Sequence, residues 1–376
     1  MSYSSLCTSG STLVVAAVIT VLTSGTAMAL PPPPSSPSPL GDGVSLVQEL
    51  LPAPKLPDSA FAPVDRPGPE LSVPQPQLDQ ALSCTQDAVH ANREVVLFVP
   101  GTGLTPRENY SWNWFRALDK LGRPYCSVTL PNHAMSDTQV SAEYVVNAIR
   151  KVHSMSRRKV QVLGHSEGGT EPRFALRFWP DLRDMVDDYI TFAGTNHGTL
   201  QANALCAAGC APAVFQQRLN SRYTQAINSH QETFPGISYT QIYTRTDELV
   251  QPNLDNHGST SLHGGGGDIT NISTQDVCPT TPNEHGSVGS YDPVAYAIAT
   301  DALDHPGPAN PARISRSVCG ELFMPGVDPV TFPTSYADSL LTSAEYIALY
   351  PKVFAEPPLK PYVLAHPGDR CSVSCH

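Results

Sequence analysis

Apolar runs of strand length alternate with amphipathic segments of helix length from about residue 78 onward. This alternation is typical of parallel strands joined by crossover helices, because such strands are buried on both faces and read as continuous apolar runs. The pattern predicts an α/β fold with a mostly parallel central sheet flanked by helices. We expect strands at 94–99, 126–130, 160–163, 189–192 and 241–243, and helices at 112–121, 140–153 and 168–178.

Two segments depart from this alternation. Residues 201–234 interrupt it, and we expect them to form a small cap or lid insertion that contributes substrate-contacting residues. In residues 30–77 proline is dense and periodic apolar positions are few, which predicts a proline-rich linker or pro-segment. The catalytic domain is therefore expected to span residues 78–376.

The first 29 residues have the features of a signal peptide. An apolar run at 13–22 precedes an A-x-A sequence at 27–29, so we expect cleavage after Ala29 and a secreted, extracellular protein. Because no Lys or Arg precedes Lys55, a retained anchor is the alternative. The run is well short of the roughly 18 apolar residues that a spanning helix needs, which favours cleavage.

The charge balance argues against nucleic acid as a partner. The chain has 23 basic and 34 acidic residues and a net charge of -11, which repels phosphate backbones and anionic membrane surfaces. Two sequons, at Asn109 and Asn271, predict N-glycosylation and fit export.

The cysteines also fit an oxidising compartment. Of nine cysteines, Cys7 lies in the signal segment, and the even number that remains predicts disulfides. Two short pairs lack the spacing and the histidine ligands of zinc sites, so we expect no metal and no cofactor. These pairs are Cys206 with Cys210 and Cys371 with Cys375.

The most informative chemical motif is the sequence Gly-His-Ser-Glu-Gly at 164–168, directly after the expected strand at 160–163. A serine on a sharp turn between a strand and a helix is the nucleophile elbow of α/β-hydrolases. Its flanking glycines avoid steric clashes, and the turn lifts the hydroxyl above the sheet edge. Ser166 is therefore the candidate nucleophile.

A serine nucleophile needs a histidine base and a carboxylate that orients the base, and in this fold they follow the serine in the order acid, then histidine. Asp247 is the best acid because it follows the strand at 241–243, where ligands gather at carboxyl ends. We prefer His285 as the base, because the small residues that follow it let the ring approach Ser166. Chain order alone leaves open the acids Glu248, Asp255 and Asp268 and the bases His257, His263 and His305.

Acyl transfer also needs donors aimed at the developing oxyanion. One is expected from the backbone N–H of Glu167, and the other from the loop at 99–103, where Thr102 can add its hydroxyl. The alternative for this loop is an ordinary Pro-Gly turn. Its position after the first strand of the domain favours the oxyanion loop.

Several segments together resemble the fungal lipase B (Candida antarctica lipase B-like) family of α/β-hydrolases, over about residues 78–330. They are Phe98 to Gly103, Asp137 to Val140, Glu143 to Ile149, Thr246 to Pro252 and Glu284 to Gly286. The resemblance implies triglyceride hydrolysis by a triad of Ser166, Asp247 and His285.

The same resemblance implies disulfides, which are Cys84 to Cys126 and Cys278 to Cys319. It implies a third near the C-terminus, where Cys371 matches but Ala355 stands at its partner's position. We expect Cys375 to replace that partner, and Cys206 with Cys210 to form an added local bridge.

The chain departs from the family's type member on both sides of the nucleophile, with His165 in place of Trp and Glu167 in place of Gln. The smaller imidazole is expected to enlarge the alcohol side of the substrate pocket, which we expect His165 and Thr195 to line. A carboxylate at Glu167 would oppose the oxyanion charge. We therefore expect this side chain to face away, so that only its N–H acts.

These features predict a secreted lipase or carboxylesterase that cleaves acyl esters through a Ser-His-Asp triad and an acyl-enzyme. One alternative is an acyltransferase, or a lactone-forming or lactone-cleaving enzyme, that uses the same triad on a specialised metabolite. Another is a catalytically silent, hydrolase-like binding protein. We expect a monomer that binds an ester or lipid substrate and contacts a lipid interface transiently.

Overall fold

The computed structural model describes residues 54–366. The expected signal peptide and the cysteines Cys371 and Cys375 lie outside these residues. Within them, no helix is both long enough and apolar enough to cross a membrane.

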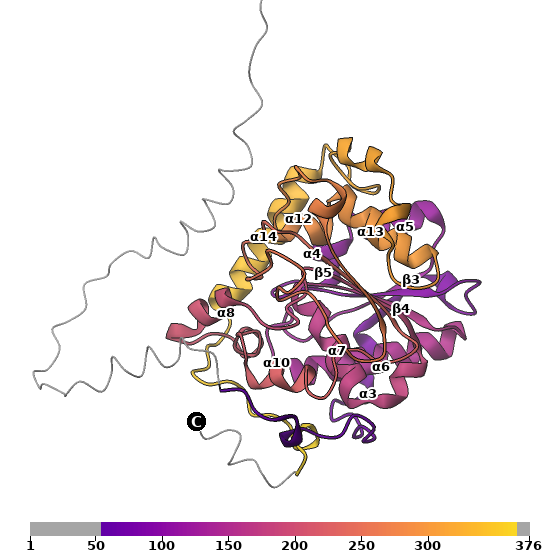
Figure 1. Cartoon of the computed structure of the whole chain (residues 1–376). Helices are drawn as coiled ribbons and strands as arrows, with labels where there is room; N and C mark the ends of the chain where they lie inside the picture. The colour runs from indigo at the N-terminus through magenta and orange to yellow at the C-terminus, as the bar shows by residue number, and fades with distance from the viewer. Residues whose placement is uncertain (1–53, 367–376) are drawn as a thin grey trace, which may run out of the picture. The chain divides into compact units, whose positions relative to one another are not determined.

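A seven-stranded sheet forms the centre, with the strand order β1-β3-β2-β4-β5-β6-β7 (Figure 1). Only β1 is antiparallel to its neighbour, and the other pairs are parallel. The α/β fold with a mostly parallel sheet is thus confirmed. The strands are β1 Leu82–Cys84, β2 Val95–Val99, β3 Tyr125–Val128, β4 Val160–His165, β5 Val186–Phe192, β6 Ser238–Tyr243 and β7 Asp268–Ser273.

The helices cover both faces of this sheet. Figure 1 shows α3, α6, α7 and α10 on one face, and α5 and α13 on the other. The helices are α3 Gln75–Gln80, α4 Pro106–Tyr110, α5 Trp114–Leu121, α6 Thr138–Ser156, α7 Thr170–Phe178, α8 Leu200–Leu205, α9 Pro212–Gln216, α10 Arg222–Ile227, α11 Thr274–Val277, α12 His285–Ser290, α13 Pro293–Asp304 and α14 Phe332–Leu349.

Strand β2 shows why its sequence is a continuous apolar run. Val95, Leu97 and Val99 pack into the core on the α6 face, whereas Val96 and Phe98 pack into the core on the α13 face. Successive side chains of a strand point to opposite faces, so a strand covered on both faces favours apolar residues at every position.

The sequence predicted five of the strands and missed the edge strands β1 and β7. Strand β1 is three residues long and only partly buried, so its apolar signal is weak. Strand β7 has exposed or half-exposed residues over its first four positions, so its apolar signal is weak as well.

The expected boundary of the folded domain at residue 78 is too late. Phe61 and Ala62 are buried, and the backbone of Ala62 hydrogen-bonds to that of Val363 over 2.9 Å. Prolines remove donors and fix φ, but they do not prevent an extended segment from packing, and the few apolar residues between them suffice here. Residues 54–77 are therefore part of the packed unit and not a linker.

The described part of the chain contains three disulfides, Cys84–Cys126, Cys206–Cys210 and Cys278–Cys319. The first joins β1 to β3 at directly paired positions. The second lies in the segment that interrupts the alternation, where α8, α9 and α10 replace a regular strand and helix.

Candidate active site

Ser166 follows β4 directly and begins the short 3₁₀ turn that leads into α7. Its φ is +56°, a left-handed conformation that is strained for a residue with a side chain. A Cβ at Gly164 would lie 2.1 Å from the carbonyl oxygen of Gly168, and one at Gly168 would lie 2.4 Å from that of Val99. Both glycines are thus required by the tight turn that presents the serine.

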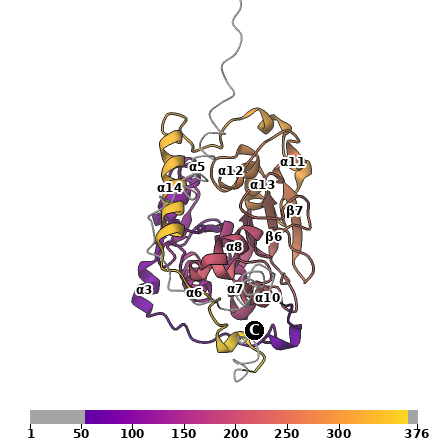
Figure 2. The ribbon, with the colours of Figure 1, turned by 90° about the vertical axis from the view of Figure 1, so that its left-hand side faces the viewer.

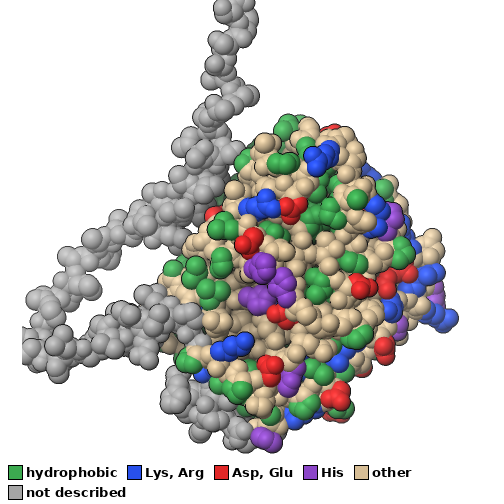
Figure 3. Space-filling view, viewed as in Figure 1, with side chains coloured by type: hydrophobic (Ala, Val, Ile, Leu, Met, Phe, Trp, Pro, Cys, Tyr) green, Lys and Arg blue, Asp and Glu red, His purple; other side chains and the backbone are tan. Residues whose placement is uncertain are grey.

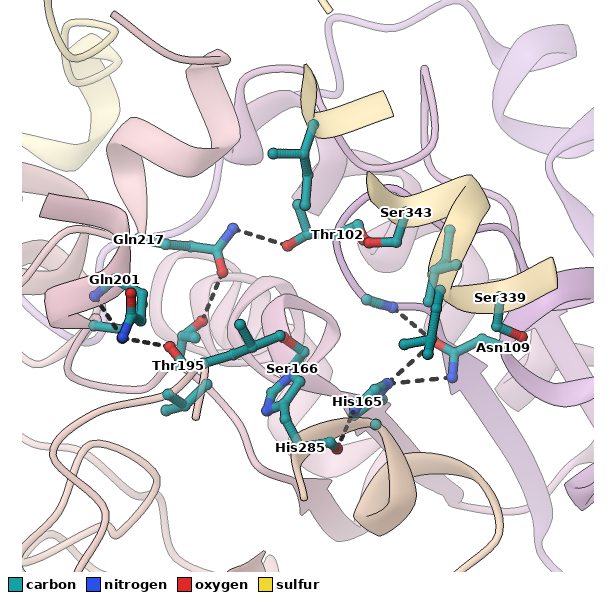
Figure 4. A pocket seen from close by; sticks show the side chains of 18 of the residues that line it. Thr102, Asn109, His165, Ser166, Thr195, Gln201, Gln217, His285, Ser339 and Ser343 are labelled. Atoms are coloured by element: carbon teal, nitrogen blue, oxygen red, sulfur yellow. Dashed lines mark hydrogen bonds between the residues drawn. The ribbon is translucent and has the colours of Figure 1, made fainter. Parts of the chain in front are cut away.

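His285 and Asp247 form a buried pair close to this turn. Asp247 lies in the loop after β6 and is held by the backbone N–H groups of Leu249 and Val250, which donate to Oδ1 over 3.0 and 2.8 Å. His285 begins α12, and its Nδ1 lies 3.1 Å from both carboxylate oxygens of Asp247. Figure 4 shows the His285 ring next to Ser166.

The pair changes the basicity of the imidazole. Burial alone would lower the pKa of His285. The charge and hydrogen bond of Asp247, together with the charges of Glu248 and Glu284, outweigh burial and raise the pKa to about 9. In the neutral ring the carboxylate holds the hydrogen on Nδ1, which leaves Nε2 unprotonated.

The alternative acids and bases lie elsewhere or have other partners. His257 and His263 are exposed and stack on each other at 5.3 Å, and the exposed His305 bonds to the carbonyl of Asp301. Asp255 and Asp268 are exposed. Glu248 is near His285, but its carboxylate accepts the backbone N–H of His285 over 3.0 Å and not the ring.

The loop after β2 packs directly against the serine turn. A Cβ at Gly101 would lie 3.2 Å from that of Ser166, so the loop backbone passes next to this serine. The N–H of Gly101 donates to Oδ1 of Asn109 over 2.9 Å, and the carbonyl of Thr102 accepts from Ser343 Oγ of α14 over 2.8 Å. These bonds fix the loop that carries Thr102.

The side chain of Glu167 does not turn away from this loop, contrary to the expectation. Its Oε2 accepts a hydrogen bond from Thr102 Oγ1 over 2.5 Å and one from Gln217 Nε2 over 2.9 Å. The residue is fully buried, and burial raises the pKa of its carboxyl to about 7. A buried carboxyl must find donors inside the protein, and Thr102 and Gln217 supply them.

His165 lines the cavity next to Ser166. Its Nδ1 accepts from Asn109 Nδ2 over 3.2 Å, and its Nε2 donates to the carbonyl of His285 over 3.3 Å. Burial and the nearby His285 lower the pKa of His165 to about 3, so this ring is neutral. A Cβ at Gly289 would lie 2.2 Å from the ring, so His165 occupies space that only a glycine leaves open.

Asn109 is not suited to carry a glycan, which corrects the prediction made from its sequon. It is 2% exposed, and its amide is bonded to Gly101 and His165 inside the site. Asn271 is half-exposed, and its amide bridges the backbone N–H and carbonyl of Leu262. Glycosylation there stays a prediction.

Gln217 is a site residue that the sequence analysis missed. Its Nε2 donates to Thr102 Oγ1 over 3.0 Å as well as to Glu167, and its Oε1 accepts from Thr195 Oγ1 over 3.3 Å (Figure 4). The residue lies in the expected cap segment 201–234, but that segment has no motif that singles out one glutamine.

The cavity over Ser166 has largely apolar walls. They come from α8, from the loop after β6 and from α14, and Figure 2 shows α8 and α14 facing the viewer on the same side of the unit. The expected cap segment therefore contributes to the pocket, whereas the part taken by α14 was not expected. The apolar wall residues include Leu104, Ala202, Leu205, Val214, Leu249, Val250, Leu340 and Ile347.

A strained serine after a central parallel strand, followed in the chain by a buried aspartate and histidine pair, is the arrangement of the α/β-hydrolase class. A family model described as Lipase (class 2) matches residues 132–281. Lipase B of Pseudozyma antarctica is 33% identical over 299 residues, which cover 78% of this chain and 86% of that protein. The chain therefore belongs to the fungal lipase B family, and it is a carboxylic ester hydrolase.

A solved structure agrees with this assignment. The crystal structure of Aspergillus fumigatus lipase B matches with a TM-score of 0.71 and 28% sequence identity, over 84% of this chain and 78% of that one. The family inferred from the sequence motifs is thus confirmed by both comparisons.

Proposed function

We propose that this hydrolase cleaves esters with apolar acyl groups through an acyl-enzyme on Ser166. The observation that carries the proposal is the geometry of His285, whose Nδ1 is held 3.1 Å from Asp247 while the ring lies next to Ser166 in an apolar cavity. Neutral His285 takes the serine proton as Oγ attacks the ester carbonyl.

The tetrahedral oxyanion is stabilised in this mechanism by the backbone N–H groups of Thr102 and Glu167. Collapse of the intermediate breaks the bond to the alcohol, which leaves with the proton from His285. Water then loses a proton to His285 and attacks the acyl-enzyme, and the carboxylic acid departs as Ser166 recovers its proton.

The proposal extends to the substrate's acyl chain and to the compartment in which the enzyme acts. The apolar cavity walls favour a hydrocarbon acyl chain, since burial of each CH₂ group contributes about 0.8 kcal/mol. The three disulfides favour an oxidising compartment and so support secretion after cleavage of residues 1–29.

The test is the variant Ser166→Ala, assayed with p-nitrophenyl esters and triglycerides of graded chain length. We expect kcat to fall by on the order of 10⁴-fold or more, with unchanged thermal unfolding. A fluorophosphonate probe should label the wild type on Ser166. Near-normal activity of the variant, or an unlabelled folded wild type, would contradict the proposal.

A second set of assays separates hydrolysis from acyl transfer. Product analysis with and without an acceptor alcohol should give mainly the free acid in water. Exclusive formation of a new ester would show that the enzyme is an acyltransferase.

A further inference from the structure

A pair of buried carboxyl groups lies behind the loop that carries Thr102. Glu167 follows the nucleophile, Glu171 lies one turn later in α7, and both are fully buried. The two carboxyls lie within hydrogen-bonding reach of each other. The mechanism above uses only the backbone of Glu167 and nothing of Glu171.

The hydrogen bonds around the pair are incomplete in a way that points to a shared proton. Within residues 54–366, Oε1 of Glu167 and both carboxyl oxygens of Glu171 have no well-formed hydrogen bond. The Thr170 hydroxyl lies near the Glu171 carboxyl, but it donates to the carbonyl of Glu167 over 2.8 Å. Two buried carboxylates at this separation cannot both be ionised, because their charges repel and no water solvates them. At least one proton must therefore reside on the pair.

The charged and titratable groups around the pair do not neutralise it. Tyr223 of α10 and Tyr189 of β5 face Glu171, but burial raises the pKa of each hydroxyl far above its usual range, so they stay neutral. Arg173 of α7 directs its guanidinium to Asn196 Oδ1 and to the carbonyls of Ile227 and Glu232. On the loop and cap side, the partners of Glu167 are the neutral Thr102 and Gln217.

The number of protons on the Glu167–Glu171 pair affects catalysis through Thr102. A threonine hydroxyl has one hydrogen to donate, and here it is given to Oε2 of Glu167. The same hydroxyl accepts from Gln217 Nε2 over 3.0 Å. While Glu167 is a carboxylate, the Thr102 hydroxyl therefore cannot donate to an oxyanion as well.

We propose that the Glu167–Glu171 pair is a proton-controlled positioning device, which decides whether the Thr102 hydroxyl donates to Glu167 or to the oxyanion. The inference rests on the proposed function at Ser166. With one proton on the pair, Glu171 donates to the Glu167 carboxylate and Thr102 is held by it. With a second proton, Glu167 donates to Thr102 Oγ1, and the threonine hydrogen is free to turn toward the substrate carbonyl.

The direction of the pH effect follows from the environment of each group. Burial and the charge of Glu167 raise the pKa of Glu171 well above its usual range, so Glu171 keeps its proton at neutral pH. Burial raises the pKa of Glu167 to about 7, so this group changes its charge near neutrality. The additional oxyanion donor is therefore present below about pH 7 and is lost as the pH rises through that value.

The variant Glu167→Gln tests the device, because an amide can donate to Thr102 Oγ1 at every pH. We expect the ratio of kcat/KM for this variant to that of the wild type, on p-nitrophenyl butyrate, to be near one at about pH 5. Above about pH 7 this ratio should rise, to a limit on the order of 100-fold, which is the contribution of one oxyanion donor. A ratio rather than a rate is used because the titration of His285 is common to both proteins. A ratio that stays constant from about pH 5 to about pH 9 overturns the inference.

Two further variants show whether the pH dependence of this ratio requires the Thr102 hydroxyl. In the background Thr102→Val, which has no hydroxyl hydrogen, Glu167→Gln should give a flat ratio, and a rise there overturns the inference. Glu356→Gln is the matched control, because burial also raises the pKa of Glu356 to about 7 but its carboxyl accepts the backbone N–H groups of Arg222 and Tyr223. Its ratio to the wild type should be flat.

A spectroscopic readout separates this inference from the proposed function. In Ser166→Ala with isotope-labelled glutamate, infrared difference spectra against Ser166→Ala/Glu167→Gln should contain a protonated carboxyl band that disappears near neutral pH. A Glu167 carboxyl already ionised at about pH 5 overturns the inference even if Ser166 is the nucleophile. If Ser166→Ala remained active, the proposed function would fail while this titration still reported on the pair.

Discussion

At the scale of single residues, the site depends on how burial and neighbouring charges shift the pKa values of its ionisable groups. Burial and the adjacent His285 lower the pKa of His165 to about 3. Asp247, together with Glu248 and Glu284, outweighs burial and raises the pKa of His285 to about 9. Their rings are only 5.0 Å apart. One imidazole is thus kept neutral as a wall residue, while the other has the basicity of a proton acceptor.

The pKa of His285 gives a pH dependence that can be measured. His285 in its neutral form is the proposed base. In the Glu167→Gln background, where the Thr102 donor does not change with pH, kcat/KM should therefore rise with pH toward a plateau above about pH 9. In Asp247→Asn the carboxylate charge is lost, so the rise should move to lower pH, and the plateau should fall by on the order of 10⁴-fold. A pH–rate profile with a soluble ester measures both effects.

Glu248→Gln is the control for this prediction. The carboxylate of Glu248 also raises the pKa of His285, but less than Asp247 does. Its loss should move the rise only slightly and leave most of the plateau. An unchanged profile in Asp247→Asn would contradict the assigned role of Asp247.

At this scale the sequence predicted the sharp turn at Ser166, because that turn imposes glycines at fixed positions. It was wrong about the side chain of Glu167, because the direction of that side chain depends on Gln217, fifty residues later in the chain.

At the scale of secondary-structure elements, α14 and α8 contribute apolar side chains to the lining of the cavity. Several leucines of these helices and of the loop after β6 are exposed, among them Leu200, Leu205, Leu249, Leu341 and Leu349. Figure 3 shows apolar side chains on the side of the unit that carries α8 and α14. Helix α14 is tied to the body by Tyr336, whose hydroxyl donates to Glu284 over 2.6 Å.

Leu205 allows a test of the acyl side of the pocket. It lines the cavity and is 44% exposed. Leu205→Asp should reduce kcat/KM for long-chain p-nitrophenyl esters by on the order of tenfold, while butyrate esters are little affected, because a carboxylate opposes burial of the distal chain. Leu322→Asp is the control, since Leu322 is 80% exposed and lies outside the cavity lining. Equal loss for all chain lengths would show that Leu205 does not contact the acyl chain.

The sequence analysis did not predict α14, and its burial pattern explains why. Over its length only Ser339 is buried, so the helix has no continuous apolar face against the core. A helix that borders a cavity lacks the periodicity from which helices are recognised.

At the scale of the packed unit, the segments near the two ends of the described chain hold each other. Phe61 pairs with Leu364 in an antiparallel bridge, and Arg66 donates to the carbonyls of Leu364 and Ala365 over 2.8 and 2.9 Å. The buried Arg177 of α7 donates to the carbonyl of Ala62. These contacts join both segments to the core under α7.

Phe61→Ala should therefore lower the free energy of unfolding by about 3 kcal/mol, because Phe61 is 2% exposed and its removal leaves a cavity. Phe354→Ala, at a position 74% exposed, should change it by less than about 0.5 kcal/mol. Chemical denaturation with intact disulfides measures both values. Similar values for the two variants would show that residues 54–77 add nothing to the fold.

The sequence by itself determined the five inner strands of the sheet, the turn at Ser166 and the family, because buried strands require apolar runs and the turn at Ser166 requires Gly164 and Gly168. Tertiary structure alone decided that residues 54–77 pack on the core, that α14 borders the pocket and that Asn109 is an internal donor. It also decided that Glu167 and Glu171 form a buried pair behind Thr102. These features are contacts between residues far apart in the chain, or side-chain directions set by such contacts, and no local pattern encodes them.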